Sequence, residues 1–150
     1  TDGKKNVLPG NGLIKGDARA FSQKTNTLIE QNMRQLVKGI CDSYGVSYDV
    51  KYETTCPMTF NQSKQAESAT KAAVKLLGDD KCNGDIDPRP FSEDFSIMSE
   101  NTPGCFVLMG NGTSGSYGRP LHSADYDFND ELLVKGSSYW VELAEQQLKI

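Results

Sequence analysis

The stretch "LIKGDARAF" (Leu13–Phe21) is the part of the sequence that decides the expected fold. Even positions from Ile14 to Ala20 carry small or apolar residues, and odd positions from Lys15 to Arg19 carry charges. Alternation with a period of two is typical of a β-strand that buries one face. We therefore predict a strand here, with its small residues toward a packed helix and its charges toward solvent or a cleft.

A helix and a second strand are predicted to follow this first strand. Residues Thr27–Tyr44 carry apolar side chains at helical spacing. These are Ile29, Met33, Leu36 and Ile40. Thr27 is expected to cap the start of the helix and Gly45 to end it. Val46–Tyr52 then has the composition of a strand, so the first 54 residues predict a strand, a helix and a strand.

The second part of the chain, after a connection around Thr54–Phe60, predicts helices and one more strand. The helices are expected from Ser63 to a stop at Gly78, over Ser92–Ser99 and over Asn129–Leu148. Uniform apolarity predicts a buried strand at Cys105–Met109. The side chains expected to face inward from the last helix are Leu132, Leu133, Gly136, Trp140 and Leu143. The whole pattern predicts an α/β fold.

Composition and charge exclude some partners. The chain has 150 residues and a net charge of -4, which argues against a nucleic-acid-binding surface. No apolar run has membrane-spanning length, so no membrane partner is expected. None of the four cysteines forms a C-x-x-C pair, and free thiols suit a reducing, cytoplasmic compartment. The first residue is Thr1, so we expect the natural N-terminus to be missing.

The stretch "CFVLMGNGTSGSYGRPLHS" (Cys105–Ser123) raises several site hypotheses. Its Gly110-x-Gly112-x-x-Gly115 pattern would need to open a helix to bind a dinucleotide, and no helical pattern follows. Asn111-Gly112-Thr113 and Asn61-Gln62-Ser63 are glycosylation sequons that we expect to be unused. His122 is the only histidine, and a metal site needs three or four ligands. The residues alone leave open whether His122 is functional or an ordinary loop residue.

Other local patterns favour structural interpretations. In "SEDF" (Ser92–Phe95), a serine cap followed by two acidic residues suits the first turn of a helix. The alternative makes Glu93 a polar group that lines an active site. The loop after Asp79 faintly resembles a calcium loop, but Lys81 and Pro90 stand where ligands are required. No G-x-S-x-G sequence precedes His122, which disfavours a serine hydrolase.

Four segments in order resemble the C-terminal part of the metal-dependent amidohydrolases that include hippurate hydrolase, aminoacylases, indole-acetyl-amino-acid hydrolases and related zinc carboxypeptidases. They are "NVLPGNGLIKGDARAF" (Asn6–Phe21), "SEDFS" (Ser92–Ser96), "PGCFVLMGNG" (Pro103–Gly112) and "RPLHSADYDFNDELL" (Arg119–Leu133). The resemblance implies an α/β catalytic domain with two divalent metal ions and a smaller four-stranded lid that dimerises. Residues 1–54 would be the second half of this ferredoxin-like lid, and residues 55–150 the C-terminal part of the catalytic domain.

The resemblance also assigns residues. His122 matches a metal-ligand histidine, Asn6 a substrate-binding asparagine and Arg19 the lid arginine that binds the substrate carboxylate. Guanidinium is the natural partner of a carboxylate, which agrees with Arg19 on the polar face of its segment. Glu93 falls in an acidic motif of the family and is assigned to substrate binding, although the glycine that often precedes that motif is absent here.

The implied activity is hydrolysis of an amide bond in an N-acyl amino acid or a small peptide-like substrate by a homodimer. Zinc is the expected metal, with manganese, cobalt or nickel as alternatives. The catalytic glutamate and the other metal ligands are expected outside this chain, so we expect no catalytic residue here and no activity from residues 1–150 alone. The competing hypothesis is a non-catalytic dimerisation or small-ligand-binding module built on a ferredoxin-like unit.

Overall fold

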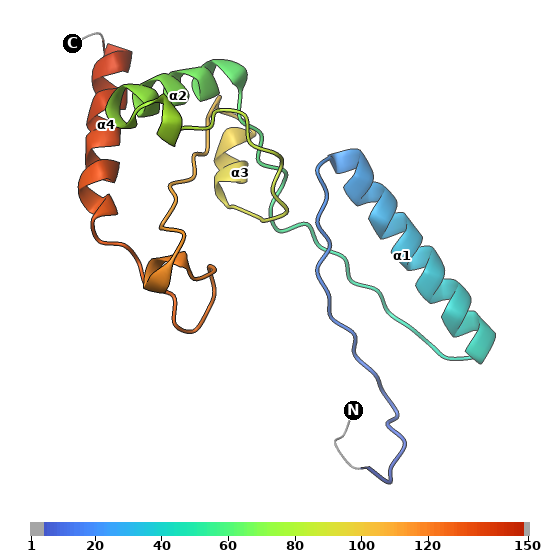
Figure 1. Ribbon diagram of the computed structural model, residues 1–150. Coiled ribbons are helices and arrows are strands. Elements are labelled where there is room, and N and C mark those ends of the chain that lie inside the picture. Colours follow the sequence, from blue (N-terminus) through green and yellow to red (C-terminus); the bar gives the residue numbers. More distant parts are fainter. Residues whose placement is uncertain (1–4, 149–150) are drawn as a thin grey trace. The chain divides into compact units, whose positions relative to one another are not determined.

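The computed structural model describes residues 5–148, which form helices joined by extended and turn segments (Figure 1). The α-helices are α1 (Gln23–Tyr44), α2 (Ser63–Leu77), α3 (Phe95–Ser99) and α4 (Leu132–Leu148), with 3-10 turns η1 (Asp79–Lys81) and η2 (Gly115–Gly118). The chain divides into two units, of which the first ends at Met58 and the second begins at Thr59. Of the described helices, none is both long and apolar enough to cross a membrane.

The predicted α/β fold is wrong, because residues 5–148 contain no β-strand. The segments Leu13–Phe21 and Val46–Tyr52 are extended but form no strand pairing within residues 5–148, and Ile14 is 97% exposed. A strand needs a second backbone to pair its N–H and C=O groups. Side-chain alternation predicts which face would be buried and says nothing of a pairing partner. The sheet expected of a half ferredoxin-like lid is therefore absent from residues 5–148, and the competing ferredoxin-like module has lost its structural basis.

The third predicted strand, Cys105–Met109, also fails to form. The segment is extended, and its last three side chains, Val107, Leu108 and Met109, are exposed rather than buried. Both backbone groups of Phe106 bond to the side chain of Asn61 and not to a neighbouring strand. Uniform apolarity thus identifies a segment suited to burial, but residues 5–148 contain no sheet in which it could be buried.

Helix α1 begins earlier than predicted and ends where predicted. Its cap is Ser22, whose Oγ accepts a hydrogen bond from the Thr25 N–H at 3.0 Å, so the proposed cap at Thr27 is wrong. Serine satisfies an N–H group that otherwise lacks a partner at a helix start. At the other end Gly45 has φ +66°, the left-handed conformation that glycine adopts without strain. The predicted stop at Gly45 is confirmed.

Polar contacts hold the extended segment after α1 against that helix. The Arg34 guanidinium donates to the carbonyl of Val50 at 2.9 Å, and the Tyr52 hydroxyl donates to Asn26 Oδ1 at 2.6 Å. The apolar stripe predicted on α1 is present, but it is uncovered: Leu36 is 63% exposed, and no residue of α1 is buried. The described part of the first unit therefore has polar attachments in place of an apolar core.

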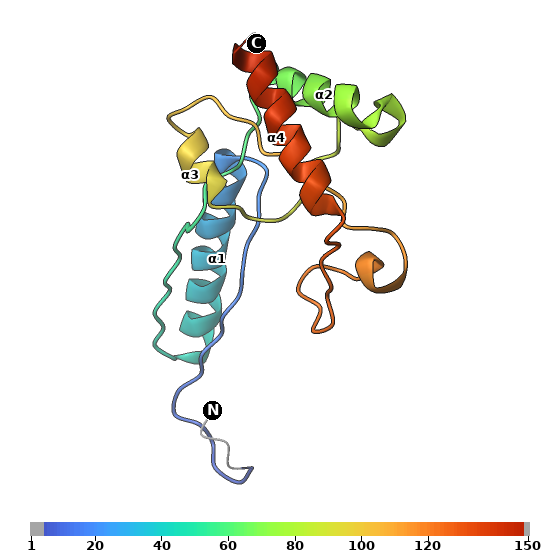
Figure 2. The same ribbon diagram turned by 90° about the vertical axis from the view of Figure 1, so that its left-hand side faces the viewer.

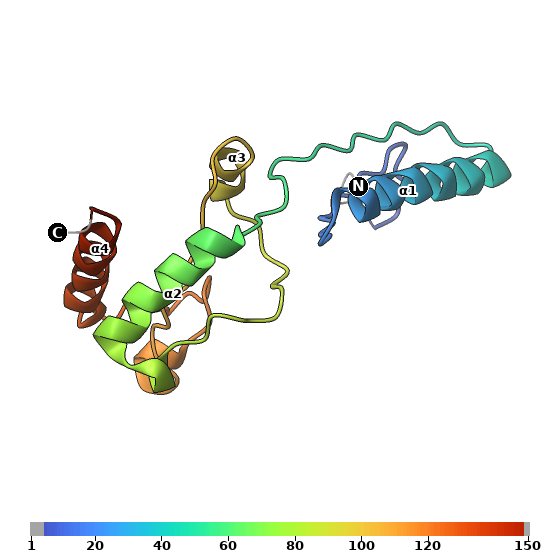
Figure 3. The ribbon, with the colours of Figure 1, turned by 90° about the horizontal axis from the view of Figure 1, so that it is seen from above.

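The second unit is built around the packing of α2 against α4, which Figures 2 and 3 show from two further directions. Tyr139 of α4 is 6% exposed and lies against α2, where Ala69 and Ala72 are also buried. Its hydroxyl donates to the Ala69 carbonyl at 3.4 Å. Lys75 Nζ pairs with Glu142 at 2.7 Å at the edge of the contact. Small residues on α2 let a large aromatic ring approach closely, which stabilises the pair.

The inward face of α4 differs from the prediction by part of a turn. Tyr139 is buried, whereas the predicted Trp140 is 64% exposed and Leu133 is also exposed. Leu132, Gly136 and Leu143 are partly covered. Together with Tyr139 they form the inward stripe, in which successive residues lie four, three and four positions apart. The sequence offers two apolar stripes on this helix, and only the alanines of α2 decide which one packs.

Candidate functional site

The loop from Gly110 to the start of α4 carries the single histidine, and its two ends are tied together by Asn111. The Asn111 Nδ2 donates to the carbonyls of Tyr117, at 3.1 Å, and Asp127, at 2.8 Å. The Asn111 Oδ1 accepts a hydrogen bond from the Asn129 N–H at 2.8 Å, and the backbone carbonyl of Asn111 accepts one from Asn129 Nδ2 at 3.3 Å. Figure 1 shows this loop in orange, next to the start of α4. One side chain thus closes a loop whose ends lie 18 positions apart.

A second closure lies inside the first. The Arg119 guanidinium pairs with the Asp125 carboxylate and donates to the Asp125 carbonyl at 3.1 Å. The Ser123 hydroxyl donates to the other carboxylate oxygen of Asp125. The Ser123 N–H donates to the Pro120 carbonyl at 3.2 Å and closes a four-residue turn. His122 is the third residue of that turn.

The backbone of His122 is unusual. Its φ is +67°, and among the described residues it is the only non-glycine residue with positive φ. Positive φ at the third residue is what type II turns require, and glycine or asparagine normally occupies it. Holding histidine there costs about 1–2 kcal/mol, which the surrounding hydrogen bonds must offset. Such strain is common at functional sites, and it favours a role for the His122 side chain.

The His122 ring is available to a ligand. The side chain is exposed, and among residues 5–148 it takes part in no hydrogen bond or ion pair. A neutral imidazole nitrogen is a common metal ligand. However, the described residues include no group of three or more His, Cys, Asp or Glu side chains placed to hold a metal ion. His122 therefore fits the role of one ligand, and any metal site it serves needs further donors from elsewhere.

Glu93 is half-buried and precedes the short helix α3. Its carbonyl accepts hydrogen bonds from Ser96, at 3.1 Å from the N–H and 2.6 Å from the hydroxyl. The cap of α3 is Asp94, without a side-chain hydrogen bond, so the predicted cap at Ser92 is wrong. In the part of the chain described, no hydrogen bond or ion pair joins Glu93 to His122. The structure gives Glu93 a backbone role in starting α3, and its carboxylate role stays a prediction.

The two residues assigned to substrate binding in the first unit both precede α1. Asn6 is exposed and lies in a turn. Arg19 is exposed and pairs with Asp17 at 2.7 Å. Exposed ion pairs contribute about 0–1 kcal/mol, so the pair with Asp17 holds the Arg19 side chain only weakly. Their proposed roles in substrate binding stay predictions.

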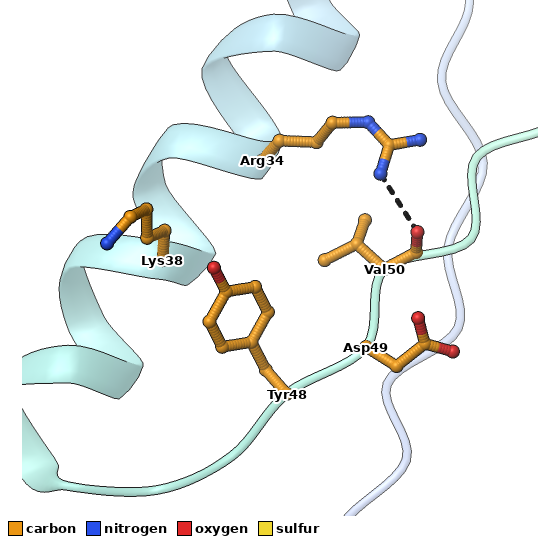
Figure 4. Close-up of a pocket in the computed structure, with 5 residues that line it drawn as sticks. All are labelled: Arg34, Lys38, Tyr48, Asp49 and Val50. Carbon is orange, nitrogen blue, oxygen red and sulfur yellow. Dashed lines mark hydrogen bonds between the residues drawn. The ribbon is translucent and has the colours of Figure 1, made fainter.

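A pocket of about 330 Å³ lies between α1 and the segment that follows it (Figure 4). Its lining residues are Arg34, Lys38, Tyr48, Asp49 and Val50. Arg34 is already paired with Glu30 at 2.7 Å, and Lys38 is paired with Asp42. Both cations are therefore compensated within their own helix. None of the residues assigned from the sequence lines this pocket.

The residues that shape the His122 loop were missed as functional candidates. Asn111 was noticed only as the first residue of a glycosylation sequon. In the structure its side-chain amide donates two hydrogen bonds. The amide of Asn61, the other sequon asparagine, is likewise engaged with Phe106. A better signal was present in the sequence, because asparagine beside glycine at a segment end is suited to a loop closure.

Comparison with known proteins covers nearly the whole chain. The model of peptidase family M20/M25/M40 matches residues 2–146. Hippurate hydrolase of Campylobacter jejuni is 29% identical over 144 residues, which cover 96% of this chain and 37% of that protein. Thermostable carboxypeptidase 2 of Saccharolobus solfataricus is 26% identical over 137 residues, with 89% and 34% covered. N-acetyldiaminopimelate deacetylase of Lacticaseibacillus casei is 24% identical over 146 residues, with 96% and 37% covered.

The chain thus spans just over a third of the length of these relatives. No solved structure matches it significantly.

Proposed function

The chain belongs to peptidase family M20/M25/M40, and on that premise we propose that it forms part of a hydrolase that cleaves amide bonds. The proposed substrates are N-acyl amino acids or small peptide-like molecules. The observation that carries the proposal is the family match over residues 2–146. The names of the hippurate hydrolase, carboxypeptidase and deacetylase relatives support the substrate class.

His122 is the residue of this chain that we assign to the metal centre. Its exposed ring, which pairs with no side chain or backbone group of residues 5–148, and its strained backbone support the assignment. In the proposed enzyme it holds one of two divalent ions, zinc by preference, through a ring nitrogen. Bound metal supplies a Lewis acid and an activated water for amide hydrolysis. The other ligands and the general base are proposed to lie outside residues 1–150, which would leave this chain inactive alone.

Substrate binding is assigned to Asn6, Arg19 and Glu93. The Arg19 guanidinium is proposed to bind the substrate carboxylate, because its planar set of donors matches two carboxylate oxygens. The Asn6 carboxamide can donate to or accept from the same end of the substrate. Glu93 is proposed as a polar wall of the site. Residues 1–54 then belong to a lid and dimerisation domain, and residues 55–150 to the catalytic domain.

Homodimerisation through the first unit is part of the proposal. Large apolar side chains stay exposed along α1, among them Leu36 and Ile40. Contiguous apolar surface of this kind marks interaction sites in soluble proteins. The described residues of the first unit provide nothing that covers this stripe.

The proposal is tested with the purified enzyme that contains this chain. N-benzoyl and N-acetyl amino acids are incubated with it, and the free amino acid released is measured. A matched set of the same compounds with the carboxylate converted to an amide tests the role of Arg19. We expect hydrolysis that a chelator abolishes and added zinc restores, with the free carboxylates preferred. Failure to hydrolyse any member of the panel, or turnover unaffected by chelation, would contradict the proposal.

A further inference from the structure

We propose that Asn111 is a positioning residue, whose side chain closes the loop that presents His122 and thereby sets the metal affinity of the site. The inference rests on the proposed function, because it assumes that His122 binds a metal ion. It assigns to Asn111 a role that acts through His122 and requires no contact with substrate or metal.

The carboxamide of Asn111 joins three backbone groups of the loop. Asn111 Nδ2 bonds the carbonyls of Tyr117 and Asp127, and Oδ1 bonds the N–H of Asn129. These partners lie before and after His122 in the sequence. Among residues of this size, only asparagine has two donors and an acceptor in its side chain, so it can bond three backbone groups of a loop at once.

The closure made by Asn111 is anchored on the start of helix α4. Asn129 Oδ1 accepts from the Glu131 N–H at 3.2 Å, and the Asn129 carbonyl accepts from the Leu132 N–H at 2.9 Å. Leu132 is the first residue of α4. Asn111 therefore holds the His122 loop to the start of a helix that is itself packed on α2. Sites supported by helices are placed more accurately than sites on loops alone.

Asn111 and His122 differ in burial. Asn111 is partly buried, whereas His122 is exposed. The inner turn, closed by Arg119 and Asp125, fixes the local conformation of His122. It does not fix where that turn lies relative to α4. Among the hydrogen bonds of the loop, those of Asn111 with Asp127 and Asn129 fix the position of the turn relative to α4. A loop without them would lose more conformational entropy when it binds a ligand.

The experiment compares three variants of the metal-loaded enzyme. Asn111→Ala removes every side-chain bond, and Asn111→Asp keeps the acceptor for Asn129 but loses both donors. Asn61→Ala is the matched control, because Asn61 also makes two hydrogen bonds to a backbone, that of Phe106. Zn²⁺ affinity is measured by competition with a chromophoric chelator, and amide hydrogen exchange is measured over residues 113–128.

We expect both Asn111 variants to lose about 10–100-fold in Zn²⁺ affinity, the range found for residues that orient metal ligands. Exchange over residues 113–128 should speed up in both. Asn61→Ala should destabilise the protein without changing either quantity. Unchanged Zn²⁺ affinity in a folded Asn111→Ala protein would overturn the inference, and so would an equal loss in Asn61→Ala.

A fourth variant separates this inference from the proposed function. If His122→Gly binds Zn²⁺ as tightly as the unaltered enzyme, the assignment of His122 fails and the inference fails with it. If His122→Gly loses Zn²⁺ while Asn111→Ala does not, only the role of Asn111 fails.

Discussion

The side chain of Asn61 makes both hydrogen bonds that a neighbouring strand would make with Phe106. Asn61 Nδ2 donates to the Phe106 carbonyl at 2.9 Å, and Asn61 Oδ1 accepts from the Phe106 N–H at 2.8 Å. Next to it, Gln62 and Gly104 also bond to each other twice, at 3.2 Å and 2.7 Å. The start of α2 is thereby attached to the extended segment at residues 104–106 without a sheet.

The α2–α4 contact predicts a large loss of stability for one aromatic residue of α4 and a small change for its neighbour. Tyr139→Ala should lower the free energy of unfolding by about 3–5 kcal/mol, because it empties a buried ring site against Ala69 and Ala72. Trp140→Ala should change it by only about 0.5 kcal/mol, because that ring is 64% exposed. Denaturant unfolding of the two variants measures both values. A larger loss for Trp140→Ala would mean that α4 packs through its other face.

Two glycines of the His122 loop form a matched pair. A Cβ on Gly118 would lie 2.7 Å from the backbone carbon of Thr113, whereas a Cβ on Gly110 would meet nothing within 4 Å. Gly118→Ala must therefore displace η2, and it should speed hydrogen exchange over the loop and weaken Zn²⁺ binding by the proposed enzyme. Gly110→Ala should leave both near the unaltered values. Equal behaviour of the two variants would argue against the backbone path described for the loop.

Arg19 provides a test of carboxylate recognition. Arg19→Lys keeps the charge but loses the planar donors, so KM for an N-acyl amino acid should rise by roughly 10-fold or more, with a smaller effect on kcat. Asp17→Asn, which removes one carboxylate that pairs with Arg19 at 2.7 Å, should leave KM equal or lower it. Steady-state kinetics of both variants measure these values. An unchanged KM in Arg19→Lys would remove Arg19 from the proposed substrate site.

The pH dependence of Cys105 thiol reactivity should differ between the folded and the unfolded protein. Burial raises the pKa of the Cys105 thiol above its ordinary value. A raised pKa means that the reactive thiolate forms at higher pH in the folded protein than in the unfolded chain. The midpoint of the rate of iodoacetamide alkylation should therefore move to higher pH on folding. Mass spectrometry of the Cys105 peptide, with and without urea, gives the two curves, and coincident midpoints would show that the thiol is not buried.

The helices were largely predictable from the sequence because their signals are local. The stop at Gly45 and the end of α2 before Gly78 follow from glycine conformation, and both are confirmed. The start of α1 was wrong, because two residues in one short stretch, Ser22 and Thr27, can each cap a helix. The face of α4 could not be decided from α4 alone, since it depends on the small residues that α2 brings to it.

The strands and the site were harder to predict from the sequence than the helices, for different reasons. Strand pairing is a relation between distant segments, and the alternation in Leu13–Phe21 carries no information on a partner. His122 was distinguished from an ordinary loop histidine by family resemblance, and its positive φ could not be read from the sequence. The role of Asn111 could not be predicted from the sequence, because it depends on which carbonyls its side-chain amide reaches. Those carbonyls are brought to it only by the folded loop.

The central claim is that the His122 ring supplies a metal ligand to an amide hydrolase. The most direct measurement is the zinc bound per subunit, together with turnover of an N-benzoyl amino acid, in His122→Gly and His122→Asn. Both replacements suit the positive φ of the turn, so they remove the ring with little backbone strain. We expect both variants to stay folded, bind less zinc and lose turnover. Full zinc content and full turnover in either folded variant would contradict it.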